Sequence, residues 1–394
     1  MRPDLTAVAC LPALIVRDLT ALALPLPVGA RNGALDAAVG WLCRSHDATG
    51  RRGTSSGYDL VYGWLPADLE MSGCAIGTIL EQALRTDRHD LTRRAIELGA
   101  WATAAQGASG AVADGHVRPP CSRSVVLATG AALHGWVDLI GAGHSGFEEA
   151  ADRGARFLVD ELRRARTEAA EADPRNTGIA DARTAWALLR WATLAEGDEA
   201  REVASRQLGW TCGRQLANGW FRDDGLGFGH AASTAAIAST LRALLEGYCL
   251  TEETAWLDCA QRAADALVEV IQRPGPLPSS FADDWRAASR SSSPSATAQL
   301  GAALLALHQV TGDARWLTGG LRAVEQAAGS QCRGRFVSGA LAGSVPLWRR
   351  DGRFRLPTGA TKSLADGLMI YVDCVTGAHG GGVGSVAPRR EEVG

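Results

Sequence analysis

Histidines, acids and aromatic residues gather in the segments between predicted helices, and His230 is the strongest acid–base candidate among eight histidines. It follows Asp223 and Asp224 and directly precedes a predicted helix. Imidazole titrates near neutrality, and nearby carboxylates would hold it in a useful protonation state. A solvated loop histidine is the alternative interpretation. His116, beside Arg118 in an earlier segment, is the next candidate, and Asp224 and Arg118 are candidate binding groups.

An aromatic and acidic group surrounds the start of the helix predicted over residues 69–86. Tyr58 and Trp64 offer ring faces next to the carboxylates of Asp68 and Glu70. This combination suits a sugar ring or an unfolded peptide. Tyr58 and Glu70 are candidate catalytic groups, and Trp64 and Asp68 are candidate binding groups. Capping of the helix dipole by the acids, and packing by the tryptophan, remain open alternatives.

Asp181 and Arg183 open the helix predicted over residues 180–196. An arginine can bind a carboxylate through two hydrogen bonds, and an aspartate can accept a proton from a carbon next to a carbonyl. Asp181 is therefore a candidate base and Arg183 a candidate ligand of a substrate carboxyl group. An internal salt bridge that closes the fold is an equally well supported interpretation.

Asp284, Trp285, Trp348 and Lys362 complete the candidate binding residues. Adjacent aspartates at 283 and 284 could bind a divalent cation, but no second group of oxygen ligands stands at a suitable spacing. The sequence has neither a G-x-x-x-x-G-K-[ST] loop nor a strand-linked G-x-G-x-x-G. We therefore predict no metal and no cofactor.

A repeat of 53–60 residues indicates which elements position these groups. A helix start with Gly or Asp, followed by acidic and apolar residues, recurs near positions 32, 87, 144, 197, 252 and 312. Each repeat has a second helix that is apolar or small on nearly every side, as expected for a buried helix. These inner helices are predicted over residues 69–86, 123–140, 180–196, 233–250, 296–311 and 359–375. The pattern predicts an all-α (α/α)6 toroid of six helical hairpins.

Unequal connections indicate where a site would lie. Links from an inner helix to the next outer helix are short, whereas the six links in the other direction are long and would form the rim of a central funnel. We predict that residues 31–376 form the toroid, residues 1–30 an N-terminal extension and residues 377–394 a disordered, flexible tail. A cleaved signal peptide is the alternative for the N-terminal segment.

Composition restricts the partners. Of 394 residues, 46% are hydrophobic and 21% charged, and the net charge of −3 gives no general field for nucleic acid or an anionic membrane. The apolar stretch from Thr6 to Val16 is too short to span a membrane. Nine cysteines occur without a C-x-x-C pair, which predicts reduced thiols, no zinc site and a cytoplasmic location.

Local patterns that belong together recur along residues 33–373. They are segments 57–60, 63–66 with Glu70, 182–189, 218–221, 240–246, 284–286, 343–348 and 360–362, with Gln299 and Asp366. In this order they resemble a family of bacterial six-hairpin toroid proteins from polysaccharide and secondary-metabolite gene neighbourhoods, related in fold to glycan lyases, unsaturated glucuronyl hydrolases and sugar epimerases. The resemblance implies the toroid fold more strongly than any one reaction.

Departures from the family pattern affect the expected chemistry. The resemblance implies a His at Asp181, a His at Ala235, an Asp at Ala128, an Asn at Thr297 and a Trp at Gly359. If relatives use those groups for catalysis, this chain must act through others or only bind.

Three functional hypotheses follow. The leading one is a lyase or epimerase that removes a proton α to a carbonyl on a uronic-acid glycan or a related natural product. The second is a binding subunit that holds a peptide or an oligosaccharide for a partner enzyme, as in a peptide-modification complex with dehydration or epimerisation. The third is a glycoside hydrolase that acts on unsaturated uronyl groups.

Overall fold

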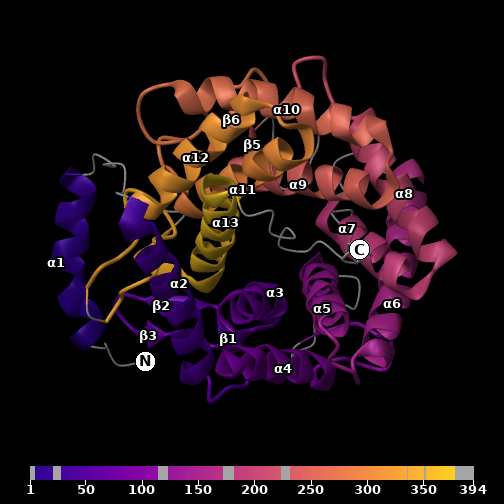
Figure 1. The fold of residues 1–394 in the computed structure, drawn as a ribbon, viewed down its shortest axis with the longest axis horizontal. Coiled ribbons are helices and arrows are strands. Elements are labelled where there is room, and N and C mark those ends of the chain that lie inside the picture. The colour runs from indigo at the N-terminus through magenta and orange to yellow at the C-terminus, as the bar shows by residue number, and fades with distance from the viewer. Residues whose placement is uncertain are drawn as a thin grey trace, which may run out of the picture.

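The computed structural model describes residues 5–20, 28–113, 123–171, 182–222, 231–334, 336–349 and 352–377. Within these ranges the chain forms thirteen helices and seven strands, and each strand is only two or three residues long. All but one of the helices form two concentric rings around a central opening (Figure 1). The predicted (α/α)6 toroid is confirmed.

The inner ring follows the predicted boundaries to within about two residues at each end. Its helices are α3 (Leu69–Thr86), α5 (Arg123–Gly141), α7 (Ala182–Ala195), α9 (Thr234–Thr251), α11 (Pro294–Thr311) and α13 (Thr358–Thr376). The outer ring consists of α2 (Val28–Ala48), α4 (His89–Ala104), α6 (Glu148–Glu171), α8 (Asp198–Gly213), α10 (Thr254–Gln272) and α12 (Ala314–Gly329). Each inner helix packs against the inner helices on both sides of it, including α13 against α3.

The ring closes where its last helix, α13, meets its first helices, α2 and α3. Five inner helices pack most closely on the outer helix that follows each of them, while α13 packs on α2, the first outer helix. A buried clamp joins α13 to α3, because Arg85 Nη1 and Nη2 donate to the two carboxylate oxygens of Asp373 at 2.7 and 2.6 Å. This paired geometry is the strong form of an arginine–carboxylate contact. Closure therefore combines helix packing with a charged contact.

Small residues bring α3 and α5 together. A Cβ on Gly73 would lie 2.6 Å from the backbone carbon of Ala131, and a Cβ on Gly135 would lie 3.0 Å from the Gly73 carbonyl oxygen. Real Cβ atoms do not approach other atoms at 2.6 Å, so the helix contact needs glycine at Gly73. The spacing between these two inner helices is therefore set by backbone-to-backbone packing.

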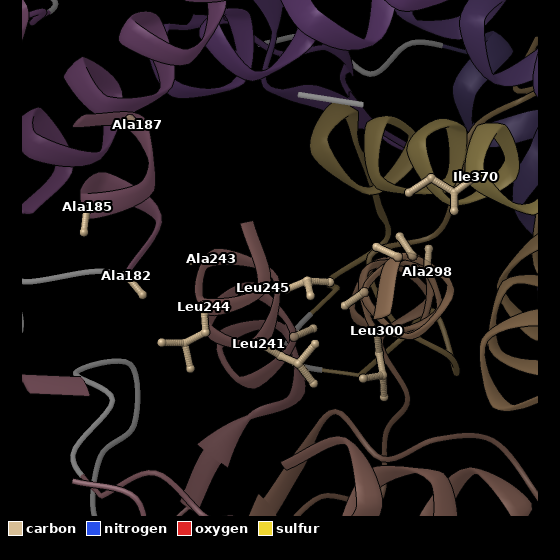
Figure 2. Packing of buried hydrophobic residues seen from close by; sticks show 14 of the residues in the cluster. Ala182, Ala185, Ala187, Leu241, Ala243, Leu244, Leu245, Ala298, Leu300 and Ile370 are labelled. Carbon is tan, nitrogen blue, oxygen red and sulfur yellow. The ribbon is translucent and has the colours of Figure 1, made fainter. Parts of the chain in front are cut away.

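A continuous apolar core fills the layer between the rings. Figure 2 shows alanines of α7 together with leucines of α9 and α11 and Ile370 of α13 in this core. Helix α5 contains a window, Ser124–Gly141, that is long and apolar enough to cross a membrane, but 67% of this window is buried inside the ring. Its apolar character is accounted for by its place in the core.

Short antiparallel strands tie the long rim segments together. Strand β1 (Thr54–Ser55) pairs with β4 (Ala67–Asp68), and β5 (Ala231–Ser233) pairs with β6 (Ser280–Ala282). A third sheet has the order β3 (Gly63–Trp64), β2 (Gly57–Asp59) and β7 (Arg355–Pro357), and thus joins the first rim segment to the last. The rim segments are consequently held by backbone hydrogen bonds on one end of the ring.

Helix α1 (Leu5–Thr20) lies outside the rings (Figure 1). Leu14 of this helix joins a small apolar cluster with Trp41, Tyr58 and Leu347, and the Leu347 backbone N–H donates to Asp18 Oδ2 at 2.7 Å. The predicted extension over residues 1–30 thus includes a helix packed on the last rim segment, while its end overlaps the start of α2. The predicted tail lies outside the described residues except for Gly377.

Candidate functional site

A cavity of about 430 Å³ lies inside the inner ring. All six inner helices contribute to its walls, and the rim segments lead into their N-terminal ends. The volume is within the range of sites for small ligands. Its lining includes seven acidic or basic residues, Glu70, Asp138, Arg183, Arg190, Arg242, Lys362 and Asp366. His134 also lines the cavity.

Near the mouth, Glu70 of α3 faces Arg183 of α7. Arg183 Nη1 lies 3.6 Å from Glu70 Oε1, and both side chains remain about one third exposed, at 35% and 27%. Asp68 caps α3 by accepting a hydrogen bond from the Met71 backbone N–H at 2.8 Å, which fixes the turn that carries Glu70. An acid and a guanidinium are therefore available together at the entrance to the cavity.

Lys362, one turn after the start of α13, places a cation in the cavity wall. Lys362 Nζ is 2.7 Å from Asp366 Oδ2, and Thr78 Oγ1 donates to Asp366 Oδ1 at 2.6 Å. Burial acts to lower the pKa of Lys362, but Asp366 and the other acidic groups nearby outweigh it, so that the pKa is raised. Lys362 is therefore an ammonium ion at neutral pH, suited to stabilise negative charge in the cavity.

Cys74 lies one helical turn after Glu70 and on the same face of α3. Burial raises the pKa of its thiol, while Lys362 acts in the opposite direction. Glu70, Arg183 and Asp366 also act on this thiol, which shows that Cys74 stands among the charged groups of the mouth. We expect a neutral thiol here, and not a thiolate nucleophile.

His134, Arg190 and Asp138 form a closed network between α5 and α7. Arg190 Nη2 donates to Asp138 Oδ1 at 2.6 Å, and Arg190 Nη1 lies 3.2 Å from His134 Nδ1. A guanidinium can only donate, so Nδ1 must accept, and the ring proton resides on Nε2, 3.3 Å from the Arg183 carbonyl oxygen. Burial, followed by Arg190, holds the pKa of His134 well below its usual value. Both nitrogens are thus engaged, and the network forms a rigid part of the wall.

Helices α9, α11 and α13 contribute neutral polar groups to the lining. Gln299 Nε2 donates to Ser363 Oγ at 2.9 Å, and Ser239 Oγ donates to Gln299 Oε1 at 3.4 Å. Trp186 of α7 supplies a ring surface, with the His134 ring at 4.4 Å between centroids and Arg242 6.0 Å from its centroid. Hydroxyl and amide groups beside an aromatic ring can bind sugar hydroxyls and the apolar face of a sugar.

Three of the sequence-predicted site residues meet in this cavity, namely Glu70, Arg183 and Lys362. The titratable cavity residues that sequence reasoning did not select as site residues are His134, Asp138, Arg190, Arg242, Asp366 and Cys74. A signal for them was present: Glu70 and Cys74, His134 and Asp138, Trp186 and Arg190, and Lys362 and Asp366 each recur at a spacing of four within inner helices. Five predicted residues, His116, Arg118, Asp181, Asp224 and His230, lie outside the described residues.

The remaining predicted residues lie apart from the cavity lining. Tyr58 is 5% exposed, and its ring packs edge-on against Trp41 and Trp64 at centroid distances of 5.9 and 5.2 Å. These aromatics, together with the capping residue Asp68, support the first rim segment. Tyr58 and Trp64 thus belong to the apolar cluster beneath helix α1.

The predicted residues of the last two rim segments are also structural or exposed. Asp284 pairs with Arg286 at the surface. Trp285 is buried, and its Nε1 donates to the Asn218 carbonyl oxygen at 2.9 Å. Trp348 is 41% exposed and is not part of the cavity lining.

Gly359 gives a physical reason for one departure from the family pattern. A Cβ at this position would lie 2.4 Å from Met71 Sδ, so the Met71 side chain fills the space in which a larger residue at 359 would stand. Ala128 and Thr297 are buried and do not line the cavity. Across the described part of the chain, no group of three or more His, Cys, Asp or Glu side chains is arranged to hold a metal ion.

Comparisons with known proteins identify the fold. No protein-family model matches the chain, and no curated protein matches it in sequence. Among solved structures, the unsaturated glucuronyl hydrolase from Bacillus sp. GL1, responsible for the degradation of glycosaminoglycan, matches with a TM-score of 0.65 and 15% identity over 86% of this chain and 96% of that chain. A D-mannose isomerase matches with a TM-score of 0.63 and 12% identity over 88% and 98%. A hydrolase variant with the oligosaccharide dGlcA-Glc-Rha-Glc matches with a TM-score of 0.64 and 15% identity over 85% and 95%. The chain shares their toroid fold.

Proposed function

We propose that this protein is a carbohydrate-active enzyme that removes the proton next to the carboxyl group of a uronic-acid residue, leading to β-elimination or epimerisation. The observation that carries the proposal is the presence of an acid, Glu70, and two cations, Arg183 and Lys362, in one cavity. Such a reaction needs a base near the carbon and positive charge near the carboxylate.

Each of these three groups has a distinct role. Arg183 binds the substrate carboxylate at the mouth through its guanidinium. Glu70 removes the proton from C5, the carbon next to the carboxyl group. Negative charge then moves onto the carboxyl oxygens, where the Lys362 ammonium, kept charged by Asp366, stabilises it.

The fate of the carbanion separates the two outcomes. In elimination, the bond between C4 and its oxygen breaks, and the carboxylic acid formed on Glu70 can return its proton to the leaving oxygen. In epimerisation, a second group delivers a proton to the opposite face of C5. Elimination thus needs fewer groups from this site than epimerisation.

The size and lining of the cavity support a sugar substrate. A volume of about 430 Å³ suits one or two sugar rings. Gln299 and Ser239 offer contacts to hydroxyls, and Trp186 offers a ring face. The shared fold with an unsaturated glucuronyl hydrolase and a D-mannose isomerase supports the same substrate class.

Two other functions are compared with this one. Hydrolysis of unsaturated uronyl groups is favoured by the match to glucuronyl hydrolases. Binding of a peptide or an oligosaccharide for a partner enzyme is favoured by the internal pairing of charges in the cavity, such as Arg190 with Asp138. Both alternatives predict substrate binding without exchange of the C5 proton.

The deciding experiment follows the loss of the C5 proton by NMR, with a panel of uronic-acid oligosaccharides in D2O. We expect this loss with at least one substrate, accompanied by ultraviolet absorbance of a new C4–C5 double bond for elimination, or by deuterium at C5 and the signals of the C5 epimer for epimerisation. Glu70→Gln should lower the rate of proton loss by about 10²–10⁴-fold. Glu269→Gln, at an exposed acid on α10, is the matched control.

The outcomes separate the three functions. An unchanged rate of C5 proton loss in Glu70→Gln would remove this residue from the role of base. Loss of ultraviolet absorbance from an unsaturated uronyl substrate, with no loss of the C5 proton from the saturated substrates, would support the hydrolase. Binding of oligosaccharide or peptide with neither reaction would support the binding subunit.

A further inference from the structure

Two thiols meet between outer helices, away from the central cavity. Cys212 is the penultimate residue of α8, and Cys259 lies in the second turn of α10. Their side chains are hydrogen-bonded to each other. Cys259 is 1% exposed, whereas Cys212 is partly exposed at the edge of the core. The sequence separation of the two residues gives no indication of this contact.

An arginine holds the buried thiol of the pair. Arg262 Nη2 lies 3.3 Å from Cys259 Sγ, and Arg262 Nε donates to Gln215 Oε1 at 2.9 Å. Gln215 Nε2 in turn donates to the Cys259 carbonyl oxygen at 2.8 Å. The guanidinium is therefore fixed next to one sulfur by a second hydrogen bond to the glutamine.

In the hydrogen bond between the two sulfurs, the Cys212 thiol donates and the Cys259 sulfur accepts. The hydrogen bond from Cys212, and then the charge of Arg262, lower the pKa of Cys259, while the same hydrogen bond raises the pKa of Cys212. A shared proton next to a guanidinium is the kind of environment that makes a cysteine reactive. Cys249 offers a contrast, because desolvation of its thiol and the charge of Glu246 raise its pKa to about 11.

We propose that Cys212 and Cys259 form an oxidation site, at which a hydroperoxide converts the two thiols into a disulfide between α8 and α10. The inference is independent of the reaction proposed for the cavity. It rests on the contact between the two thiols, the guanidinium beside one of them and the partial exposure of the other.

One hydroperoxide is the only reactant that the two thiols need. Cys259 reacts as the thiolate, held by Arg262 and by the hydrogen bond from Cys212, and attacks one peroxide oxygen. The O–O bond breaks, the Cys212 thiol gives its proton to the departing oxygen, which leaves as water or an alcohol, and a sulfenic acid stands on Cys259. The Cys212 thiolate then attacks the Cys259 sulfur and expels hydroxide, which becomes water with the proton that Cys259 released when it ionised. Two thiols are oxidised by two electrons, and one peroxide is reduced.

The disulfide would anchor one rim segment. Cys212 lies two residues before the turn over residues 214–222. In this turn Gln215 pairs with Phe221, and Trp220 packs on Trp285 at 5.2 Å between ring centroids. Oxidation would tie the base of this turn to α10. The segment leads toward α9, an inner helix of the cavity.

The test treats the full chain with a small excess of hydrogen peroxide. Intact mass spectrometry should show the loss of two hydrogen atoms, and peptide mapping without reductant should join the peptides of Cys212 and Cys259. Cys212→Ser and Cys259→Ser should each abolish this cross-link, while Cys249→Ser should retain it. Arg262→Gln should slow its formation by about tenfold, because the thiolate loses a charged hydrogen-bond donor.

A comparison of native protein with protein unfolded in urea keeps the test independent of how well the variants fold. Preorganised thiols should cross-link at least tenfold faster in the native chain than in the unfolded chain. A cross-link between other cysteines, or sulfinic and sulfonic acids on Cys212 or Cys259 with no disulfide, would overturn the proposal. Equal rates in native and unfolded protein would also overturn it.

Discussion

Lys362 and Asp366 stand one turn apart on α13, with 2.7 Å between the ammonium nitrogen and the carboxylate oxygen, and Thr78 of α3 holds the second carboxylate oxygen. The hydrogen bond from Thr78 to Asp366 thus joins the first inner helix to the last. Asp366 keeps a partly buried cation charged in the wall of the cavity and contributes to the closure of the ring.

Removing the carboxylate of Asp366 should lower the stability of the fold. Asp366→Asn leaves a partly buried ammonium without its counter-charge, and we expect a loss of about 2 kcal/mol in the free energy of unfolding. Thr78→Val, which removes only a neutral donor, should cost about 1 kcal/mol. Urea unfolding followed by circular dichroism measures both. Equal effects of the two substitutions would contradict a stabilising role for the charge pair.

Arg183 should control selection of acidic ligands. Arg183→Ala should weaken binding of a uronic-acid oligosaccharide by about tenfold or more, because a charged hydrogen-bond donor to the carboxylate is lost. A neutral oligosaccharide of the same size should bind as before. Isothermal titration calorimetry measures both affinities, with Arg286→Ala at the surface as the matched control. A similar loss for acidic and neutral ligands would place the carboxylate elsewhere.

Two buried histidines should make the fold sensitive to mild acid. Burial, followed by Arg94, lowers the pKa of His46, and burial, followed by Arg190, lowers that of His134. The unfolded chain binds these protons near pH 6.5, while the folded chain binds them only at lower pH. Stability is therefore complete above about pH 6.5 and declines as the pH falls below it, by at most about 1.4 kcal/mol per pH unit and histidine.

Urea unfolding between about pH 7.5 and pH 5 tests this dependence. His134→Gln should reduce the slope of unfolding free energy against pH, while a substitution of the exposed His89 should leave it unchanged. A stability that rises toward acid pH would contradict the expected sign.

Close packing of α3 on α5 should forbid a side chain at Gly73. Gly73→Ala places a methyl group 2.6 Å from the backbone of Ala131, and we expect a loss of about 2 kcal/mol in unfolding free energy. Gly209→Ala, within α8 and with no heavy atom within 4 Å of the new methyl group, should instead stabilise by about 0.5–1 kcal/mol. Thermal unfolding of both variants measures the contrast, and a neutral Gly73→Ala would show that the helices can separate.

Periodicity predicted the helices well because each helix fulfils a local rule. The inner helices are apolar on nearly all sides, and the outer helices keep a polar face. Inner helices end at residues such as Asp87 and Gly312, whose backbone is left-handed. The prediction for α7 over residues 180–196 differs from Ala182–Ala195 only at the ends. The packing of α13 on α2 follows from the ring geometry. No pattern within either helix sequence indicates it.

The site was harder to predict because depth within an inner helix is not visible in the sequence. Emphasis on the rim selected Tyr58, Trp64 and Trp285, whose rings pack in apolar surroundings. Polar residues in the middle of inner helices, such as Asp138, point into the cavity, yet sequence alone offers core hydrogen bonding as an equal interpretation. Only the relative rotation of neighbouring helices decides between the two.

The pairing of α2 with α13 has a consequence for synthesis on the ribosome. Helix α2 is made early but must wait for α13, more than three hundred residues later, before its inner face is covered. Contacts so distant in the chain form slowly, and the unfinished arc exposes apolar surface at α2 and α3. We expect nascent chains that lack α13 to depend on chaperones, and the toroid to reach its native state only after nearly the whole chain has been released.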